Sequence, residues 1–178
     1  MIYWHVERNS LCIHSQLKSP SSSEVASMIE GVIHHCTEME VDRQYVDSHG
    51  QSTVALAFCR LLGFKLLPRL KAIHSQKLYR PETGRPEAYE NLQQILTKPI
   101  DWNCIEQQYD QMVKYATALR LGTAETESIL RRFTKNNAQH PTYKAFSELG
   151  KVIKTIFLCE YLHNQELRRE INEGLNVV

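Results

Sequence analysis

Alternating apolar and polar positions mark the first segments of the chain. Residues 3–7 and 11–17 each alternate, and the polar residues 8–10 between them are typical of a turn in a β-hairpin. A serine-rich break precedes Glu24, after which apolar residues recur with helical spacing. These residues are Val25, Met28, Ile29, Val32 and Ile33. The pattern predicts a hairpin followed by a helix that packs on a sheet.

A strand, a helix and a second strand are predicted next. Residues 43–47 form a short strand that ends on Asp47. Thr53 to Leu62 has helical spacing and is followed by Gly63, the residue type that most readily forms a left-handed C-cap. Residues 64–70 form another short strand, limited by a proline. This order of elements requires at least one parallel crossover, so residues 1–70 are predicted to be an α/β segment.

The character of the chain changes after residue 70. Residues 71–100 are expected to form a basic, proline-containing connector with a short helix at about residues 89–96. From Asp101 onward the pattern predicts helices throughout. We therefore divide the rest of the chain into an all-helical part, residues 101–164, and a final helical segment, residues 165–178, whose helix is expected to end at Gly174.

The apolar spacing also predicts which side of each helix faces inward. The residues expected to be buried are Ile105, Tyr109, Met112, Val113, Ala116, Leu119, Ile129, Leu130, Phe133, Phe146, Leu149, Ile153, Ile156, Phe157 and Leu162.

Composition places the chain among ordinary folded domains. Its 178 residues suit one domain, or one domain with a large insertion, and 42% are hydrophobic. No apolar run approaches the roughly 20 residues of a membrane span, and the first residues do not resemble a signal peptide. The five cysteines form no CxxC pair, which excludes a zinc ribbon or a thioredoxin-like motif. We expect buried free thiols in a reducing cytoplasm; they are Cys12, Cys36, Cys59, Cys104 and Cys159.

Asp47 is the most informative single residue. An acid at the C-terminal tip of a strand, followed by small residues and a helix, lies where open α/β sheets place ligands. Such a carboxylate suits Mg²⁺ or Mn²⁺, which prefer oxygen ligands. The alternative is an Asp that caps the turn or the next helix. His49, two residues later, is a candidate general base or an exposed turn residue.

The net charge of +1 does not by itself indicate a nucleic-acid-binding protein. Six basic residues nevertheless lie between positions 60 and 80, with no acidic residue among them. They are Arg60, Lys65, Arg69, Lys71, Lys77 and Arg80. This run is a candidate DNA-binding surface, and the alternative is a solvated connector. Arg131, Arg132 and Lys135 form a smaller cluster at a helix end, where the helix dipole by itself accounts for cations.

Five motifs closely resemble the catalytic region of Tn3-family transposases. They are YVDSHGQS at 45–52, FCRLLGFKLLPRL at 58–70, MVKYATALR at 112–120, RRFT at 131–134 and RREINEGLN at 168–176. The resemblance runs nearly end to end and in order. It implies a DDE enzyme of bacterial origin, with a ribonuclease-H-like core and an all-helical insertion before the last catalytic helix.

The resemblance also implies the chemistry. In this family three carboxylates hold two Mg²⁺ (or Mn²⁺) ions that promote cleavage and joining of DNA strands. Asp47 matches the second catalytic Asp. The first Asp would lie on a strand preceding Met1, so the core is expected to be partial, and the third acid, a Glu, is expected just beyond Val178. Glu173 is the nearest acid within the chain and is a weak candidate.

Three functions stay open from the sequence. The first is a segment of a transposase catalytic domain, truncated and inactive by itself, that acts on transposon ends and target DNA and assembles with other transposase subunits at the bacterial nucleoid. The second is a non-catalytic DNA-binding or regulatory module derived from a transposase. The third is a helical interaction protein without a role on DNA.

Overall fold

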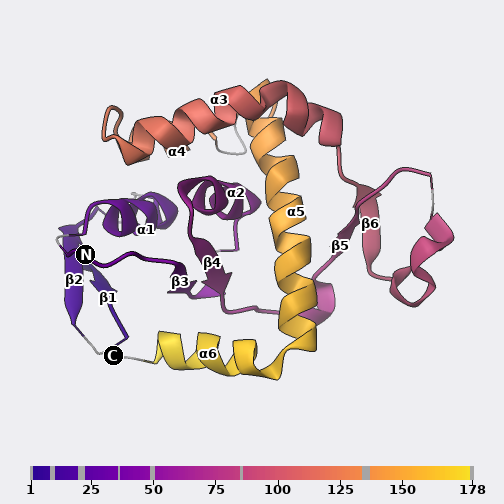
Figure 1. Cartoon of the computed structure of the whole chain (residues 1–178), viewed down its shortest axis with the longest axis horizontal. Helices are drawn as coiled ribbons and strands as arrows, with labels where there is room; N and C mark the ends of the chain where they lie inside the picture. The colour runs from indigo at the N-terminus through magenta and orange to yellow at the C-terminus, as the bar shows by residue number, and fades with distance from the viewer. Residues whose placement is uncertain are drawn as a thin grey trace.

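The computed structural model describes residues 2–8, 11–19, 23–35, 37–48, 51–84, 86–133 and 137–176 (Figure 1). The described part is mixed α/β, with short strands and the helices α1 and α2 in the first hundred residues and helices alone in the rest. The elements in chain order are β1 Ile2–Val6, β2 Cys12–Leu17, α1 Glu24–Ile33, β3 Arg43–Val46, α2 Thr53–Leu62, β4 Lys65–Pro68, the 3₁₀ helix Ile73–Ser75, β5 Leu78–Arg80, the 3₁₀ helix Pro86–Leu92, β6 Leu96–Pro99, α3 Trp102–Arg120, α4 Thr126–Arg132, α5 Pro141–His163 and α6 Gln165–Leu175.

The predicted hairpin and the helix after it are confirmed. β1 and β2 pair antiparallel, with Ile2 opposite Leu17. α1 begins where the Ser23 side chain accepts a hydrogen bond from the Ala26 amide. α1 packs against the hairpin through Gly31, where a Cβ atom would lie 2.0 Å from the His5 ring. The His5 ring of the hairpin therefore packs directly on the backbone of α1.

The parallel crossover is confirmed as well. β3 and β4 pair in parallel, with Val46 opposite Pro68, and α2 connects them. Ser52 caps the start of α2, and Gly63 ends it with a φ of 95°, in the left-handed region that favours glycine. The residues between 43 and 70 thus fold as their local pattern predicts.

The segment after residue 70 contains more structure than the expected connector. β5 and β6 form a parallel pair that the sequence pattern did not predict, and in place of the short helix expected near residues 89–96 the segment Pro86–Leu92 has short 3₁₀ turns on either side of a kink at Tyr89. Both strands lie in a polar stretch with several prolines, a composition typical of a connector, so the sequence pattern does not distinguish them from a loop.

Two large aromatic side chains organise the main core. Phe58 of α2 stacks on Phe146 of α5 with ring centroids 4.1 Å apart, and Phe133 lies against both rings. α2 and α5 cross closely at Gly150, where a Cβ atom would lie 1.9 Å from the Thr53 carbonyl oxygen. The long helix α5 therefore packs mainly on α2 and α3 rather than directly on a sheet (Figure 1).

A second, smaller core joins β4, α5 and α6. It consists of Leu67, Phe157, Leu167 and Ile171. α5 thus contributes Phe146 to the main core and Phe157 to this one.

Several predicted burial states are wrong. Tyr109, Val113, Ile156 and Leu162 are exposed, because a helix at the surface buries a narrower stripe than its apolar residues suggest. α6 runs through Gly174 to Leu175 instead of ending at the glycine. Of the cysteines, Cys59 is buried, Cys104 is partly exposed, and Cys12 and Cys159 are exposed, while Cys36 lies outside the described residues.

Candidate active site

Asp47 lies immediately beyond the C-terminal end of β3. The Arg69 amide donates a hydrogen bond of 2.8 Å to the Val46 carbonyl, which extends the parallel ladder to the residue before Asp47. This places Asp47 beside Arg69 at the edge where β3 and β4 both end, and its side chain is exposed. The location matches the predicted one, at the carboxyl ends of parallel strands.

The Asp47 carboxylate affects the pKa of a residue in the hairpin. The pKa of Tyr3 on β1 is raised by burial, and additionally by the carboxylates of Glu24 and Asp47. Figure 1 shows β1 as the hairpin strand nearer to β3. Tyr3 and Asp47 therefore border the same region between the two strand pairs.

The helix α6 is attached to β3 through one carboxylate. The Tyr45 hydroxyl donates a 2.6 Å hydrogen bond to Glu170 Oε1, and the Arg43 guanidinium forms an ion pair with the same oxygen. The hydrogen bond from Tyr45 is the main cause that lowers the pKa of Glu170. Burial, followed by this hydrogen bond, raises the pKa of Tyr45 to about 12.

Gly174 lets α6 approach the same strand closely. A Cβ atom on Gly174 would lie 2.6 Å from the Tyr45 ring. Glu170 and Gly174 are one helical turn apart, so both lie on the face of α6 that covers β3. Arg43 and Tyr45 are alternate residues of β3 and share one face of the strand, and Asp47 continues this alternation immediately beyond its end.

Glu173, the weak candidate from the sequence, lies elsewhere on α6. Its side chain is exposed. It precedes Gly174 by one residue, which is a rotation of about 100° around the helix axis. Glu170 is the acid that the structure brings to β3, and the sequence reasoning missed it. The signal that points to Glu170 is its four-residue spacing from Gly174, within the motif at 168–176.

Glutamine side chains hold the loop that follows β4. Gln51 Nε2 donates to the Arg69 carbonyl at 2.9 Å, and Gln76 Nε2 donates to the Lys71 carbonyl at 3.0 Å. Gln51 thus attaches the backbone at Arg69 to the residues just before α2, and Gln76 holds the backbone at Lys71 within the same loop.

The six cations of the candidate DNA-binding surface do not form a single patch. Arg69 and Lys71 lie at the edge that carries Asp47, and both are exposed. Lys65 is four residues before Arg69, about 13 Å away along an extended strand, and it begins β4 near the end of α2 that carries Arg60.

The last two cations belong to a third region. Lys77 precedes β5 and Arg80 ends it, and Figure 1 shows β5 and β6 on the other side of α5 from β3 and β4. Arg80 Nη2 donates to Gln93 Oε1 at 3.2 Å. Of the six, Arg69 and Lys71 are therefore the two that flank the candidate site.

The described residues offer one carboxylate at this edge for a metal ion. Among them, no group of three or more His, Cys, Asp or Glu side chains could hold a metal ion. Asp47 by itself would supply one carboxylate ligand to Mg²⁺ or Mn²⁺. Two complete metal sites therefore need further carboxylates. His49 lies outside the described residues. Within the described part of the chain, no helix is both long and apolar enough to cross a membrane.

Comparison with known proteins identifies the family. The model of the Tn3 transposase DDE domain matches residues 1–178. The chain is 31% identical over 175 residues to the transposase for insertion sequence element IS1071 in transposon Tn5271 of Comamonas testosteroni, covering 98% of this chain and 18% of that protein. It is 28% identical over 163 residues to the transposase for transposon Tn1546 of Enterococcus faecium, covering 92% of this chain and 16% of that protein.

The similarity to a third relative has the same extent. The chain is 25% identical over 174 residues to the transposase for transposon Tn21 of Escherichia coli, covering 98% of this chain and 17% of the relative. The chain thus spans less than a fifth of each of these transposases. Since the family model matches the whole chain, the protein belongs to the Tn3 transposase DDE domain family.

Proposed function

We propose that this chain is part of the catalytic domain of a transposase that cleaves and joins DNA strands, with Asp47 as one of its metal-binding carboxylates. The observation that carries the proposal is the position of Asp47, exposed at the carboxyl ends of two parallel strands within a chain that the DDE domain model matches throughout. Arg69 and Lys71 flank this carboxylate and supply positive charge for DNA phosphates.

The proposal includes a ribonuclease-H-like core. In the described residues the strands form three separate pairs, and β1 and β3 each have one edge without a strand partner. These two strands are neighbours in Figure 1, and the electrostatic effect of Asp47 on Tyr3 supports their proximity. We infer that a strand from another part of a longer transposase joins them into one sheet.

The remaining carboxylates would also come from the longer protein. The face of α6 that carries Glu170 and Gly174 lies along β3, and the third acid of the family is expected just beyond Val178. Glu173 does not lie on this face. Bound Mg²⁺ or Mn²⁺ ions would neutralise charge on the phosphate and assist ionisation of the attacking hydroxyl group. Asp47 would hold and orient such an ion at the strand end.

Substitution of Asp47 tests the proposal. In a full-length transposase carrying this chain, Asp47→Asn keeps the side-chain size and is expected to reduce cleavage and joining by at least about 100-fold, because one metal pair serves both reactions. Glu173→Gln is the matched control and should retain activity. DNA binding, measured separately, should survive both changes. Wild-type cleavage by the Asp47→Asn variant would contradict the proposal.

The isolated chain is expected to bind DNA without Mg²⁺-dependent nicking, since it offers one carboxylate at the site. A second candidate function is a non-catalytic DNA-binding or regulatory module. It is favoured by the same single carboxylate among the described residues of the site, because one carboxylate does not complete a pair of metal sites. It predicts that a longer protein containing the chain also fails to cut transposon ends.

A further inference from the structure

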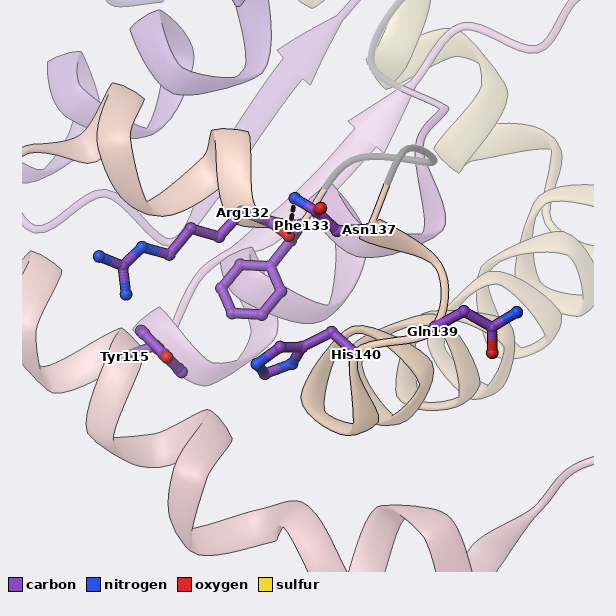
Figure 2. A pocket seen from close by; sticks show the side chains of 6 residues that line it. All are labelled: Tyr115, Arg132, Phe133, Asn137, Gln139 and His140. Atoms are coloured by element: carbon purple, nitrogen blue, oxygen red, sulfur yellow. Dashed lines mark hydrogen bonds between the residues drawn. The ribbon is translucent and has the colours of Figure 1, made fainter.

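A hollow of about 460 Å³ lies away from Asp47, where α3, α4 and α5 meet (Figure 2). Tyr115 reaches it from α3, Arg132 and Phe133 from the end of α4, and His140 from the start of α5. Asn137 and Gln139 complete its lining. Its volume falls within the about 300–1,000 Å³ of small-molecule pockets.

Aromatic rings form the floor and one side of the hollow. Phe133 is 5% exposed and packs on the main core through Phe58 and Phe146, so its ring is held firmly in place. The Tyr115 ring stands edge-on to Phe133 at 5.0 Å, and the His140 ring does so at 6.2 Å. Figure 2 shows the three rings grouped around the same space. Such rings offer flat surfaces for stacking any nucleobase.

The charge of the hollow is positive. The Arg132 side chain is exposed, and no acid among the described residues pairs with it. Its neighbour Arg131 differs, because Arg131 Nε lies 3.1 Å from Glu127 Oε1. Asn137 Nδ2 donates to the Arg132 carbonyl at 3.1 Å and so binds the backbone at the end of α4 rather than the guanidinium. None of the six lining residues that the structure describes is acidic. A free guanidinium beside aromatic rings is suited to a phosphate group with a base attached.

We propose that this hollow binds one unpaired nucleotide of a DNA strand, with the base against Tyr115 and His140 and a phosphate on Arg132. A base within a duplex is stacked on both faces and cannot enter a pocket of this kind, so the site selects single-stranded or locally unpaired DNA. This inference depends on the proposed function in one respect, which is that the ligand is DNA. It does not depend on Asp47 or on metal ions.

Fluorescence anisotropy with the 178-residue chain tests the proposal. The probes are a labelled single strand of about 12 nucleotides and a duplex of the same length, a size within the range of single-strand-binding folds. Arg132→Gln and His140→Ala should each weaken binding of the single strand by at least about fivefold, as the loss of a stacking or phosphate contact does. Both should leave duplex binding nearly unchanged. Both side chains are exposed, so the fold should persist, which circular dichroism can verify.

Arg131→Gln is the matched control, because it removes the same charge one residue away from a side chain already paired with Glu127. It should weaken single-strand binding by less than about twofold. A single strand containing 5-bromodeoxyuridine should crosslink on irradiation to Tyr115 or His140.

The outcomes separate this site from the catalytic proposal. Equal losses for the Arg131 and Arg132 variants, equal losses on single strand and duplex, or crosslinks confined to other regions would each overturn the nucleotide site. None of these results bears on Asp47. Conversely, a cleavage-competent Asp47→Asn variant would refute the catalytic assignment and leave the nucleotide site intact.

Discussion

On one face of β3, three alternate residues have different surroundings. Arg43 and Tyr45 both contact Glu170, whereas Asp47 lies exposed at the strand end. Because Glu170 attaches α6 to this strand, it is a positioning residue for the strand that carries Asp47. Glu173, three residues further along the same helix, has an exposed side chain and does not share this role.

His5 is a buried titratable residue outside the site. Its Nε2 donates a 3.2 Å hydrogen bond to the Ser27 carbonyl, and its ring fills the space above Gly31. Burial, with a smaller contribution from the nearby His14, lowers the pKa of His5 to about 4. The folded protein therefore holds a neutral imidazole at neutral pH.

This burial predicts a pH-dependent stability. Between the unfolded pKa of 6.5 and the folded pKa of about 4, the unfolded chain binds the additional proton, so the free energy of unfolding falls as the pH is lowered through this window. The loss is at most about 3.5 kcal/mol, since one pH unit corresponds to about 1.4 kcal/mol. Urea unfolding at about pH 7.5 and pH 4.5 should show a smaller decrease for His5→Gln than for the wild type. His74→Gln, at an exposed site, should behave like the wild type.

At the scale of elements, glycines determine how closely helices approach their neighbours. Gly150 of α5 faces the backbone carbonyl of Thr53 in α2, whereas Gly174 of α6 faces the ring of Tyr45. The Tyr45 side chain can move away from an added methyl group by turning about its Cα–Cβ bond, but a helix backbone must shift as a whole. The two glycines therefore have different tolerance for the same substitution.

We expect Gly150→Ala to lower the free energy of unfolding by about 2–3 kcal/mol, because overpacking exceeds the gain of about 1 kcal/mol in helix propensity. Gly174→Ala should cost about 1 kcal/mol or less. Chemical denaturation of the two variants provides the comparison. Equal effects would mean that α2 and α5 can separate as easily as a side chain turns.

At the scale of the whole molecule, α5 connects the two cores. Phe146 packs in the main core with Phe58, and Phe157 packs in the second core with Leu67 and Ile171. The second core also contains the part of β4 that pairs with the strand carrying Asp47. Loss of packing there is therefore expected to affect both the fold and the candidate site.

Neighbouring residues on α5 provide the test. Phe157→Ala should lower the free energy of unfolding by about 3–5 kcal/mol, as expected for a buried aromatic residue. Ile156→Ala, at a side chain that is 52% exposed, should cost less than about 1 kcal/mol. Thermal or urea unfolding measures both, and a similar cost for the two variants would mean that the second core contributes little.

The sequence by itself determined the local elements and the position of Asp47. Strand alternation, helical spacing and the caps at Ser52 and Gly63 are properties of residues close together in the chain, and they predicted the hairpin, the crossover between β3 and β4 and the later helices. The motifs also identified the family. The strands β5 and β6 were not predicted, because they lie in a polar stretch with several prolines that resembles a connector.

The tertiary structure decided which distant residues share a location. It separated Arg69 and Lys71 from the other cations, and it brought Glu170 rather than Glu173 to a strand 125 residues earlier in the chain. It also placed Arg132 beside the rings of the nucleotide site proposed above. The periodicity of a sequence predicts whether a residue faces the interior or the solvent. Which residue it contacts there depends on how elements far apart in the sequence pack together.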